Sequence, residues 1–231
     1  MKKILYLSFI AILVIFLFGC ESLGTTSGEK VEKYVDLGLS VKWATCNLGA
    51  ESPGEFGDYF AWGETKPKEI YDWSTYKYCE GRENTLTKYC CHTENGKVDD
   101  KIVLELADDA AYVNLGKKWR IPTAEEWTEL MENCVVIPFV YEGVQGIKLK
   151  SKINSNEIFI PCAGCKYGEE YDFDYDSPYM TSNLNLEDDE VQACYKSLSY
   201  VVCYCSYEDG EMEFDGCGGR YVGIVIRPVR P

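Results

Sequence analysis

Short runs in which apolar and polar residues alternate recur along most of the chain, and they predict β-strands. Residues 41–45 read Val-Lys-Trp-Ala-Thr, which has the period of two that is typical of a half-buried strand. The same pattern predicts strands over residues 135–140, 146–150 and 157–160, the last of them ended by Pro161. Further short strands are expected over residues 57–63, 179–182, 195–207 and 220–229.

A helical period replaces this alternation after Pro122. Thr123 is a good N-cap residue, and Glu126 follows three positions later, which together form the capping-box pattern. One helical face then carries Ala124, Trp127, Leu130, Met131 and Cys134. We therefore expect a short amphipathic helix, with Glu125 and Glu126 at the positive end of its dipole.

A second helix is predicted over residues 104–113. Its inward face would carry Leu106, Ala110 and Val113, and Gly116 supplies a C-terminal stop. Two helices in the first half and a strand-rich second half predict an α+β fold.

The segment between these elements and the early strands is long, polar and rich in tyrosine. Residues 66–100 show no clear period, and they contain Cys79, Cys90 and Cys91. Long irregular loops are usually functional or held by crosslinks. The three cysteines favour crosslinking here.

The N-terminus has the features of an export signal. Lys2 and Lys3 precede an apolar run over residues 4–18, and Leu-Phe-Gly-Cys ends at Cys20. This pattern resembles a bacterial lipoprotein signal, in which the cysteine is lipidated; an ordinary cleaved signal and an uncleaved anchor are the alternatives. We expect a signal peptide over 1–19, a lipidated flexible tether over 20–33 and one domain over 34–231. The lipid would hold the domain at a membrane, and we expect this to be the outer membrane.

Composition fits a folded domain and argues against nucleic acid as a partner. The 231 residues are 46% hydrophobic and 26% charged, and the formal net charge is -15. An acidic chain is repelled by nucleic acid, so no nucleic-acid partner is expected. His92 is the single histidine of the chain. The sequence therefore argues against a histidine-based catalytic triad and against a metal site with several histidines.

Five ordered stretches resemble one known family. They are residues 34–47 (YVDLGLSVKWATCN), 57–65 (GDYFAWGET), 108–112 (DDAAY), 119–127 (WRIPTAEEW) and 225–229 (VIRPV). Together they resemble the Fibrobacter succinogenes major paralogous domain, over nearly all of residues 34–231. The resemblance implies a C-type-lectin-like fold shared with the formylglycine-generating enzymes, with two helices flanking a mixed sheet and the first and last strands paired. The family has no established biochemical activity, so the resemblance implies more about fold than about function.

The cysteines depart from the family pattern. The chain has 12 cysteines, and removing the lipidated Cys20 leaves an odd number. Disulfides are the default interpretation in an exported protein. Candidates for disulfides or thiols are Cys46, Cys79, Cys134, Cys162, Cys165, Cys203, Cys205 and Cys217, with Cys194 a further addition. Cys162-Ala-Gly-Cys165 also has CxxC spacing, and Cys203 with Cys205 could complete a zinc site, so zinc and redox roles remain alternatives.

An acidic loop offers a candidate calcium site. Asp172, Asp174 and Asp176 alternate with Phe173 and Tyr175, and calcium prefers clustered hard oxygens. The stretch lacks the glycine and glutamate that an EF-hand loop needs, because Ser177 and Asn183 stand at those positions. The alternative is a solvated acidic loop that binds no metal.

Aromatic residues crowd the first half of the domain. Tyr59, Trp62, Tyr71, Trp73 and Tyr76 are candidate ligand-binding residues, because exposed aromatic rings stack on sugars and anchor protein partners. The alternative is that they pack in the core. Asp108 and Asp109 show no partner pattern, and a place on the helix surface or in a solvated loop is expected for them.

The sequence thus predicts an exported, membrane-anchored module that binds a glycan or a cell-surface protein without catalysis, and no cofactor is expected. One alternative is a structural or fimbria-like component of the envelope. Another is a metal-dependent oxidase related to the formylglycine-generating enzymes, which would hold copper with a pair such as Cys162 and Cys165 or Cys203 and Cys205.

Overall fold

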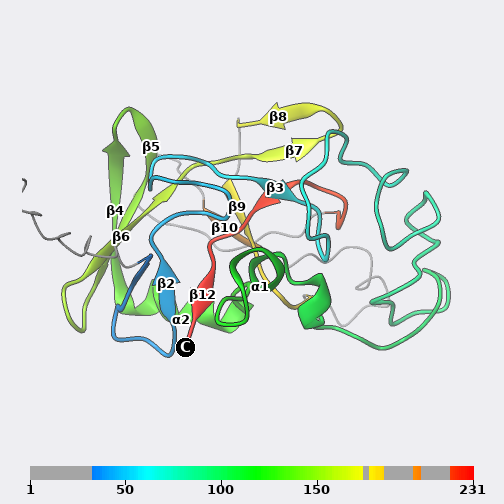
Figure 1. Ribbon diagram of the computed structural model, residues 1–231, viewed down its shortest axis with the longest axis horizontal. Coiled ribbons are helices and arrows are strands. Elements are labelled where there is room, and N and C mark those ends of the chain that lie inside the picture. The colour runs from blue at the N-terminus through cyan, green and yellow to red at the C-terminus, as the bar shows by residue number, and fades with distance from the viewer. Residues whose placement is uncertain (1–32, 174–176, 185–199, 204–218) are drawn as a thin grey trace, which may run out of the picture. The chain divides into compact units, whose positions relative to one another are not determined.

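The computed structural model describes residues 33–173, 177–184, 200–203 and 219–231, and for 200–203 the backbone only (Figure 1). Glu32–Pro231 forms one compact unit. The predicted signal peptide over 1–19, Cys20 and the tether up to residue 32 lie outside the described residues.

An early strand and the last strand lie side by side. β2 (Lys42–Ala44) is the centre of a three-stranded antiparallel sheet, between β1 (Tyr34–Val35) and β12 (Val229–Arg230). Trp43 pairs in register with Val35 and with Val229, and its side chain is fully buried. The strand predicted over 220–229 is divided into β11 (Ile224–Val225) and β12. Pro228, which lies between them, cannot donate a backbone hydrogen bond.

A mixed four-stranded sheet occupies the middle of the domain. Its order is β10 (Tyr200–Cys203), β9 (Ser177–Met180), β11 and β3 (Tyr59–Phe60). β11 runs parallel to β9 and antiparallel to β3. The aromatic strand predicted over 57–63 is therefore real but only two residues long.

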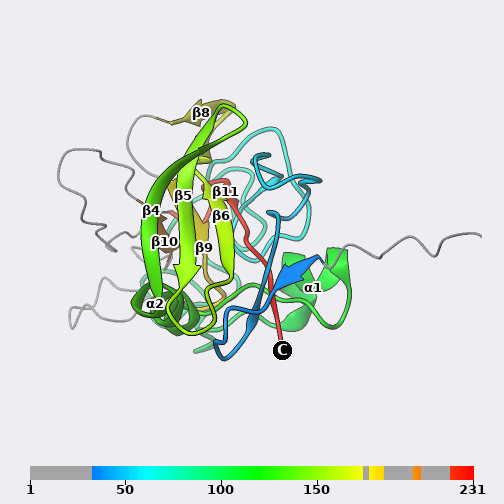
Figure 2. The same cartoon turned by 90° about the vertical axis from the view of Figure 1, so that its left-hand side faces the viewer.

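The three predicted strands of the second half form one antiparallel sheet (Figure 2). Its strands are β4 (Cys134–Tyr141), β5 (Val144–Ser151) and β6 (Glu157–Pro161), in that order. Glu142 and Gly143 connect β4 to β5, and both have positive φ angles of 49° and 91°, as a two-residue hairpin turn requires. One sheet face is buried through Ile147, Leu149 and Ile160. A separate hairpin follows, made of β7 (Cys165–Tyr167) and β8 (Glu170–Asp172).

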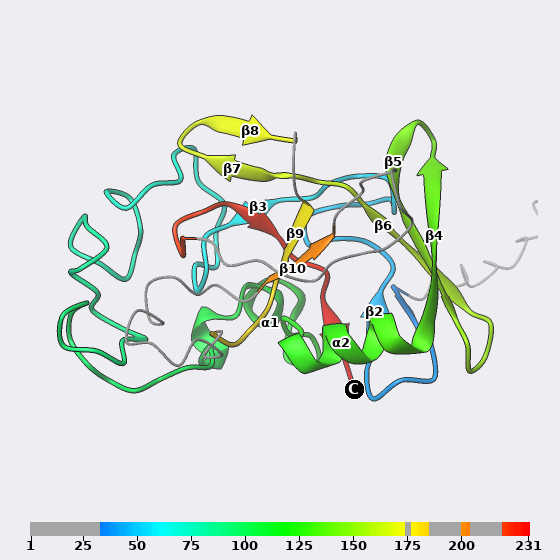
Figure 3. The same ribbon diagram turned by 180° about the vertical axis from the view of Figure 1, so that it is seen from behind.

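The helix after Pro122 has the predicted cap. α2 (Ala124–Asn133) begins after Thr123, whose hydroxyl accepts from the Glu126 amide while the Glu126 carboxylate accepts from the Thr123 amide at 2.9 Å. Trp127 and Leu130 are buried. α2 leads directly into β4, which Figure 3 shows from behind.

The other helix differs from its prediction. Residues 104–113 form a short 3-10 turn, η1 (Leu106–Asp108), and α1 (Ala110–Leu115) starts only after it. Asp109 caps α1 by accepting from the Tyr112 amide at 2.9 Å. The helix therefore starts later than predicted, and a different set of its residues faces the core. Leu106 and Val113, expected inside, are 54% and 50% exposed.

The core is built around aromatic contacts between distant segments. The rings of Trp43 and Trp127 lie 4.6 Å apart, and Trp127 contacts Tyr179 at 5.4 Å. These contacts join β2, α2 and β9. The fold is thus mixed α and β, with mostly small antiparallel sheets and few helices among the described residues.

The long segment between β3 and η1 lies away from the β4–β5–β6 sheet (Figure 1). The prediction that its cysteines crosslink it is wrong. The thiols of Cys79 and Cys90 instead donate to the carbonyls of Trp73 and His92 at 3.0 and 3.1 Å, and Cys91 is also a thiol. Buried side chains such as Leu86 and Tyr89 hold the segment to the core.

Candidate functional site

Four of the five candidate aromatic residues are buried. Tyr59, Trp62, Tyr71 and Tyr76 have exposed fractions of at most 6%. Tyr71 donates to the Tyr59 carbonyl at 2.5 Å, and Tyr76 donates to the Trp62 carbonyl at 3.0 Å. Burial raises the pKa of Tyr71 to about 12. These side chains hold the segment against the core. They therefore fit the alternative interpretation, in which the aromatic residues pack in the core.

Trp73 is the fifth candidate, and it is only partly buried. Its ring contacts Tyr76 at 5.7 Å and Tyr221 at 5.0 Å. It is the one candidate of the five that keeps some exposure, so a ligand-binding role for it stays a prediction.

Cys162 and Cys165, the two cysteines of the CxxC motif, do not form a disulfide with each other. Cys162 is disulfide-bonded, whereas Cys165 is a buried thiol. A disulfide sulfur is not a thiolate ligand, so the pair as it stands does not suit zinc or copper. Cys46, Cys79 and Cys134 are free thiols. The Cys203 side chain, Cys205 and Cys217 fall outside the described part, and predictions about them stay predictions.

The calcium site predicted at Asp172, Asp174 and Asp176 stays a prediction. Asp172 lies in β8, while Asp174 and Asp176 are outside the described residues. Within residues 33–173, 177–184 and 219–231, no group of three or more histidine, cysteine, aspartate or glutamate side chains could hold a metal ion.

Asp108 and Asp109 are buried, contrary to the expectation of a solvated position. Asp108 accepts from Lys88 at 2.5 Å and from Tyr89 at 2.7 Å. Burial alone would raise the pKa of Asp108, but these donors outweigh burial and lower it to about 2. Asp109 accepts from the Ile121 amide at 2.9 Å. Both carboxylates therefore tie the α1 region to its surroundings.

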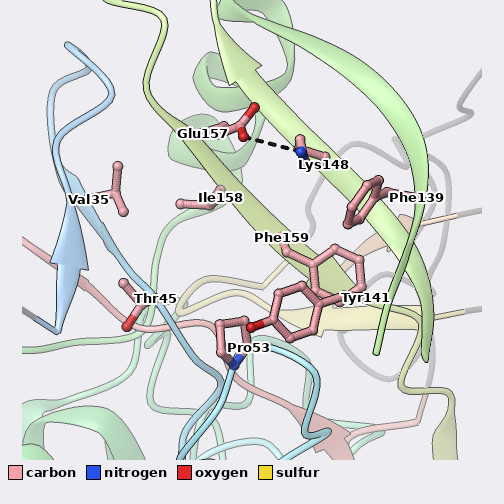
Figure 4. A pocket seen from close by; sticks show the side chains of 9 residues that line it. All are labelled: Val35, Thr45, Pro53, Phe139, Tyr141, Lys148, Glu157, Ile158 and Phe159. Carbon is pink, nitrogen blue, oxygen red and sulfur yellow. Dashed lines mark ion pairs between the residues drawn. The ribbon is translucent and has the colours of Figure 1, made fainter. Parts of the chain in front are cut away.

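The structure brings a different set of side chains together, on the exposed face of the β4–β5–β6 sheet. Opposite residues in neighbouring strands point to the same face, and the register places Phe139 beside Gly146 and Lys148 beside Phe159. A pocket of about 270 Å³ opens there (Figure 4). We call it the aromatic pocket; it is lined by Val35, Thr45, Pro53, Phe139, Tyr141, Lys148, Glu157, Ile158 and Phe159.

Three aromatic rings form one side of the aromatic pocket. The rings of Tyr141 and Phe159 are stacked 5.3 Å apart at 26°, and Phe139 meets Phe159 edge-on at 6.0 Å. Gly146 makes room for them, because a Cβ there would lie 2.6 Å from the Phe159 ring. Gly54 does the same next to Pro53, because a Cβ there would lie 3.0 Å from the Tyr141 ring.

The polar side of the aromatic pocket is an ion pair. Lys148 Nζ lies 3.1 Å from a carboxylate oxygen of Glu157, and the side chains are 26% and 44% exposed. The same ammonium lies 4.3 Å from the centre of the Phe139 ring. The pocket therefore combines ring faces, a donor and an acceptor without excess charge.

A buried arginine fixes two walls of the aromatic pocket. Arg227 donates to the Ala44 carbonyl at 3.1 Å and to the Phe159 carbonyl at 3.0 Å, and it is fully buried. Burial lowers its pKa. Ala44 precedes Thr45, so the guanidinium holds the Thr45 wall against the Phe159 wall.

Sequence reasoning predicted the three strands but missed the aromatic pocket on their outward face. The available signal was the alternation itself, since Phe139, Tyr141 and Phe159 fall on the face opposite Ile147, Leu149 and Ile160. Large aromatic residues on the outward face of a strand indicate a contact surface.

Among the residues that the structure covers, none of the helices has the length and apolar character needed to cross a bilayer. Comparison of the chain with protein-family models, with curated proteins and with solved structures finds no match.

Proposed function

We propose that this protein is an exported, lipid-anchored module of the cell envelope that binds a glycan or a protein in its aromatic pocket, without catalysis. The observation that carries the binding proposal is the pocket itself, open and lined by three aromatic rings and one ion pair. Its two charged side chains pair with each other, an arrangement better suited to holding a ligand than to exchanging protons with it.

The finer fold is also a proposal. The pairing of β2 with β12, together with two flanking helices, fits the C-type-lectin-like arrangement that the family resemblance implies. That fold hosts many binding functions, so it supports a binding module without naming a ligand.

Anchoring rests on the sequence up to Cys20. Lipid attachment there would hold the domain at a membrane, and we propose that this is the outer membrane. Replacement of the cysteine, Cys20→Ser, should move the protein from the membrane fraction to the soluble fraction of lysed cells. Unchanged membrane association would contradict the proposal.

Binding is tested with the full chain purified in detergent. Glycan and peptide arrays should give hits that the Tyr141→Ala variant loses by about tenfold or more, because the variant removes a stacked ring. Tyr171→Ala is the matched control, since Tyr171 is 54% exposed on β8 and does not line the pocket. Hits that survive Tyr141→Ala unchanged would overturn the assignment of the ligand to this pocket.

A further inference from the structure

We infer that the aromatic pocket takes a neutral sugar unit that carries two adjacent free hydroxyl groups. This inference rests on the proposed function and narrows its ligand class. The volume of about 270 Å³ lies just below the roughly 300–1,000 Å³ of sites for drug-sized ligands. A single ring-sized unit, free or at the end of a longer chain, matches that space.

The ring arrangement favours a saturated ring with an apolar face. Tyr141 and Phe159 stack face to face at 26°, with ring centres 5.3 Å apart, so each ring covers one face of the other. The pair therefore offers a ligand an outer ring face rather than a closed slot. Aromatic faces carry partial negative charge. They therefore attract the slightly positive C–H bonds on one face of a sugar ring.

The ion pair favours hydroxyl groups over charged groups. Lys148 has three N–H donors and Glu157 has two acceptor oxygens, and the contact between them uses only part of that capacity. One hydroxyl can accept from Lys148 while its neighbour donates to Glu157, with the ion pair left intact. Thr45 offers a third polar contact at the opposite wall.

Charge argues against two other ligand classes. An acidic sugar would meet Glu157, and the net charge of the chain is -15. A metal ion or an amine would meet Lys148, and Glu157 is the only carboxylate among the residues that line the pocket. A neutral polyhydroxylated ring avoids both the repulsion by Glu157 and the repulsion by Lys148.

The test measures binding of neutral methyl hexopyranosides and of a methyl hexuronide to the full chain by ligand-observed NMR. The unmodified chain should prefer the neutral glycosides. Glu157→Gln leaves Lys148 without its counter-charge, so it should weaken the neutral glycosides about tenfold and shift preference toward the hexuronide. Lys150→Met is the control, because Lys150 lies on the same face of β5 but does not line the pocket.

The outcomes separate this inference from the proposed function. Preference for the hexuronide by the unmodified chain, no neutral glycoside bound, or no response to Glu157→Gln would each overturn the sugar inference. If peptide hits on the arrays are lost in Tyr141→Ala, the pocket binds a ligand and only the ligand class is wrong. If every array hit survives Tyr141→Ala, the proposed site itself fails.

Discussion

Single buried carboxylates govern how the α1 region is held. Asp108 is surrounded by Lys77, Lys88 and Tyr89, and its side chain is only 7% exposed. Removing the carboxylate would leave the buried Tyr89 hydroxyl without its acceptor and Lys88 without one of its two counter-charges. The neighbouring Asp109 shows the opposite balance, because burial raises its pKa.

The Asp108 network makes a pH-dependent prediction. Its pKa falls from 3.8 to about 2 on folding, so its stabilisation is complete above about pH 4 and is lost as pH falls toward 2. Asp108→Asn should lower the free energy of unfolding at pH 7 by about 2 kcal/mol, and this difference should shrink below pH 4. Urea unfolding across pH 2.5–7 measures it.

Glu94→Gln is the control for that experiment, because Glu94 is exposed in the same long segment. It should change the free energy of unfolding by less than about 0.5 kcal/mol. A difference between Asp108→Asn and the unmodified chain that stayed constant down to pH 2.5 would contradict the ionic role of Asp108.

At the scale of elements, one side chain of α2, that of Glu126, makes two separate stabilising contacts. Glu126 closes the capping box with Thr123, and its two carboxylate oxygens also accept from Arg120, one of them at 2.7 Å. Its neighbour Glu125 is exposed and shares only the favourable position at the helix N-terminus. The sequence predicted the capping box for Glu126 and a favourable dipole position for both residues, and the structure adds the contact between Glu126 and Arg120.

We expect Glu126→Gln to destabilise the protein by about 1–2 kcal/mol, since it removes the charge that pairs with Arg120 and weakens the cap. Glu125→Gln should cost less than about 0.5 kcal/mol. Urea midpoints of the two variants give the comparison. Equal effects would show that only the helix dipole matters.

The edge strand of the β4–β5–β6 sheet bears on the alternative of a fimbria-like component. β4 pairs with β5 alone among the described strands, and Val135 and Val140 are 47% and 53% exposed. Pro138 lies between them and has no N–H to offer an incoming strand. The edge is therefore poorly suited to polymerisation by strand addition.

Elements with local signals were predictable, and contacts between distant segments were not. The capping box predicted α2, and the period of two predicted β4, β5 and β6. The prediction of the buried face of α1 was wrong, because Asp109, a residue inside the predicted helix, is the N-cap of the observed helix. The aromatic pocket was missed because its walls come from Val35, Pro53 and Tyr141, which no local pattern brings together.

At the scale of the whole molecule, Val229 joins three parts of the chain. It pairs with Trp43 in β2, exchanges backbone hydrogen bonds of 2.9 and 3.0 Å with Arg120, and is fully buried. Val229→Ala should lower the free energy of unfolding by about 2 kcal/mol through the cavity it leaves. Val113→Ala, at a position 50% exposed, should be nearly neutral. Denaturant unfolding compares them, and equal effects would contradict this role.

The pairing of β2 with β12 also sets an order of events in the cell. Lys42 is synthesised early, yet its partner Arg230 leaves the ribosome only after every intervening residue has been made. The central strand of that sheet therefore cannot gain its second neighbour until the chain is nearly complete. A message that is cut short before codon 229 would yield a chain whose Trp43 lacks its partner, and such a product should be an early substrate for proteolysis.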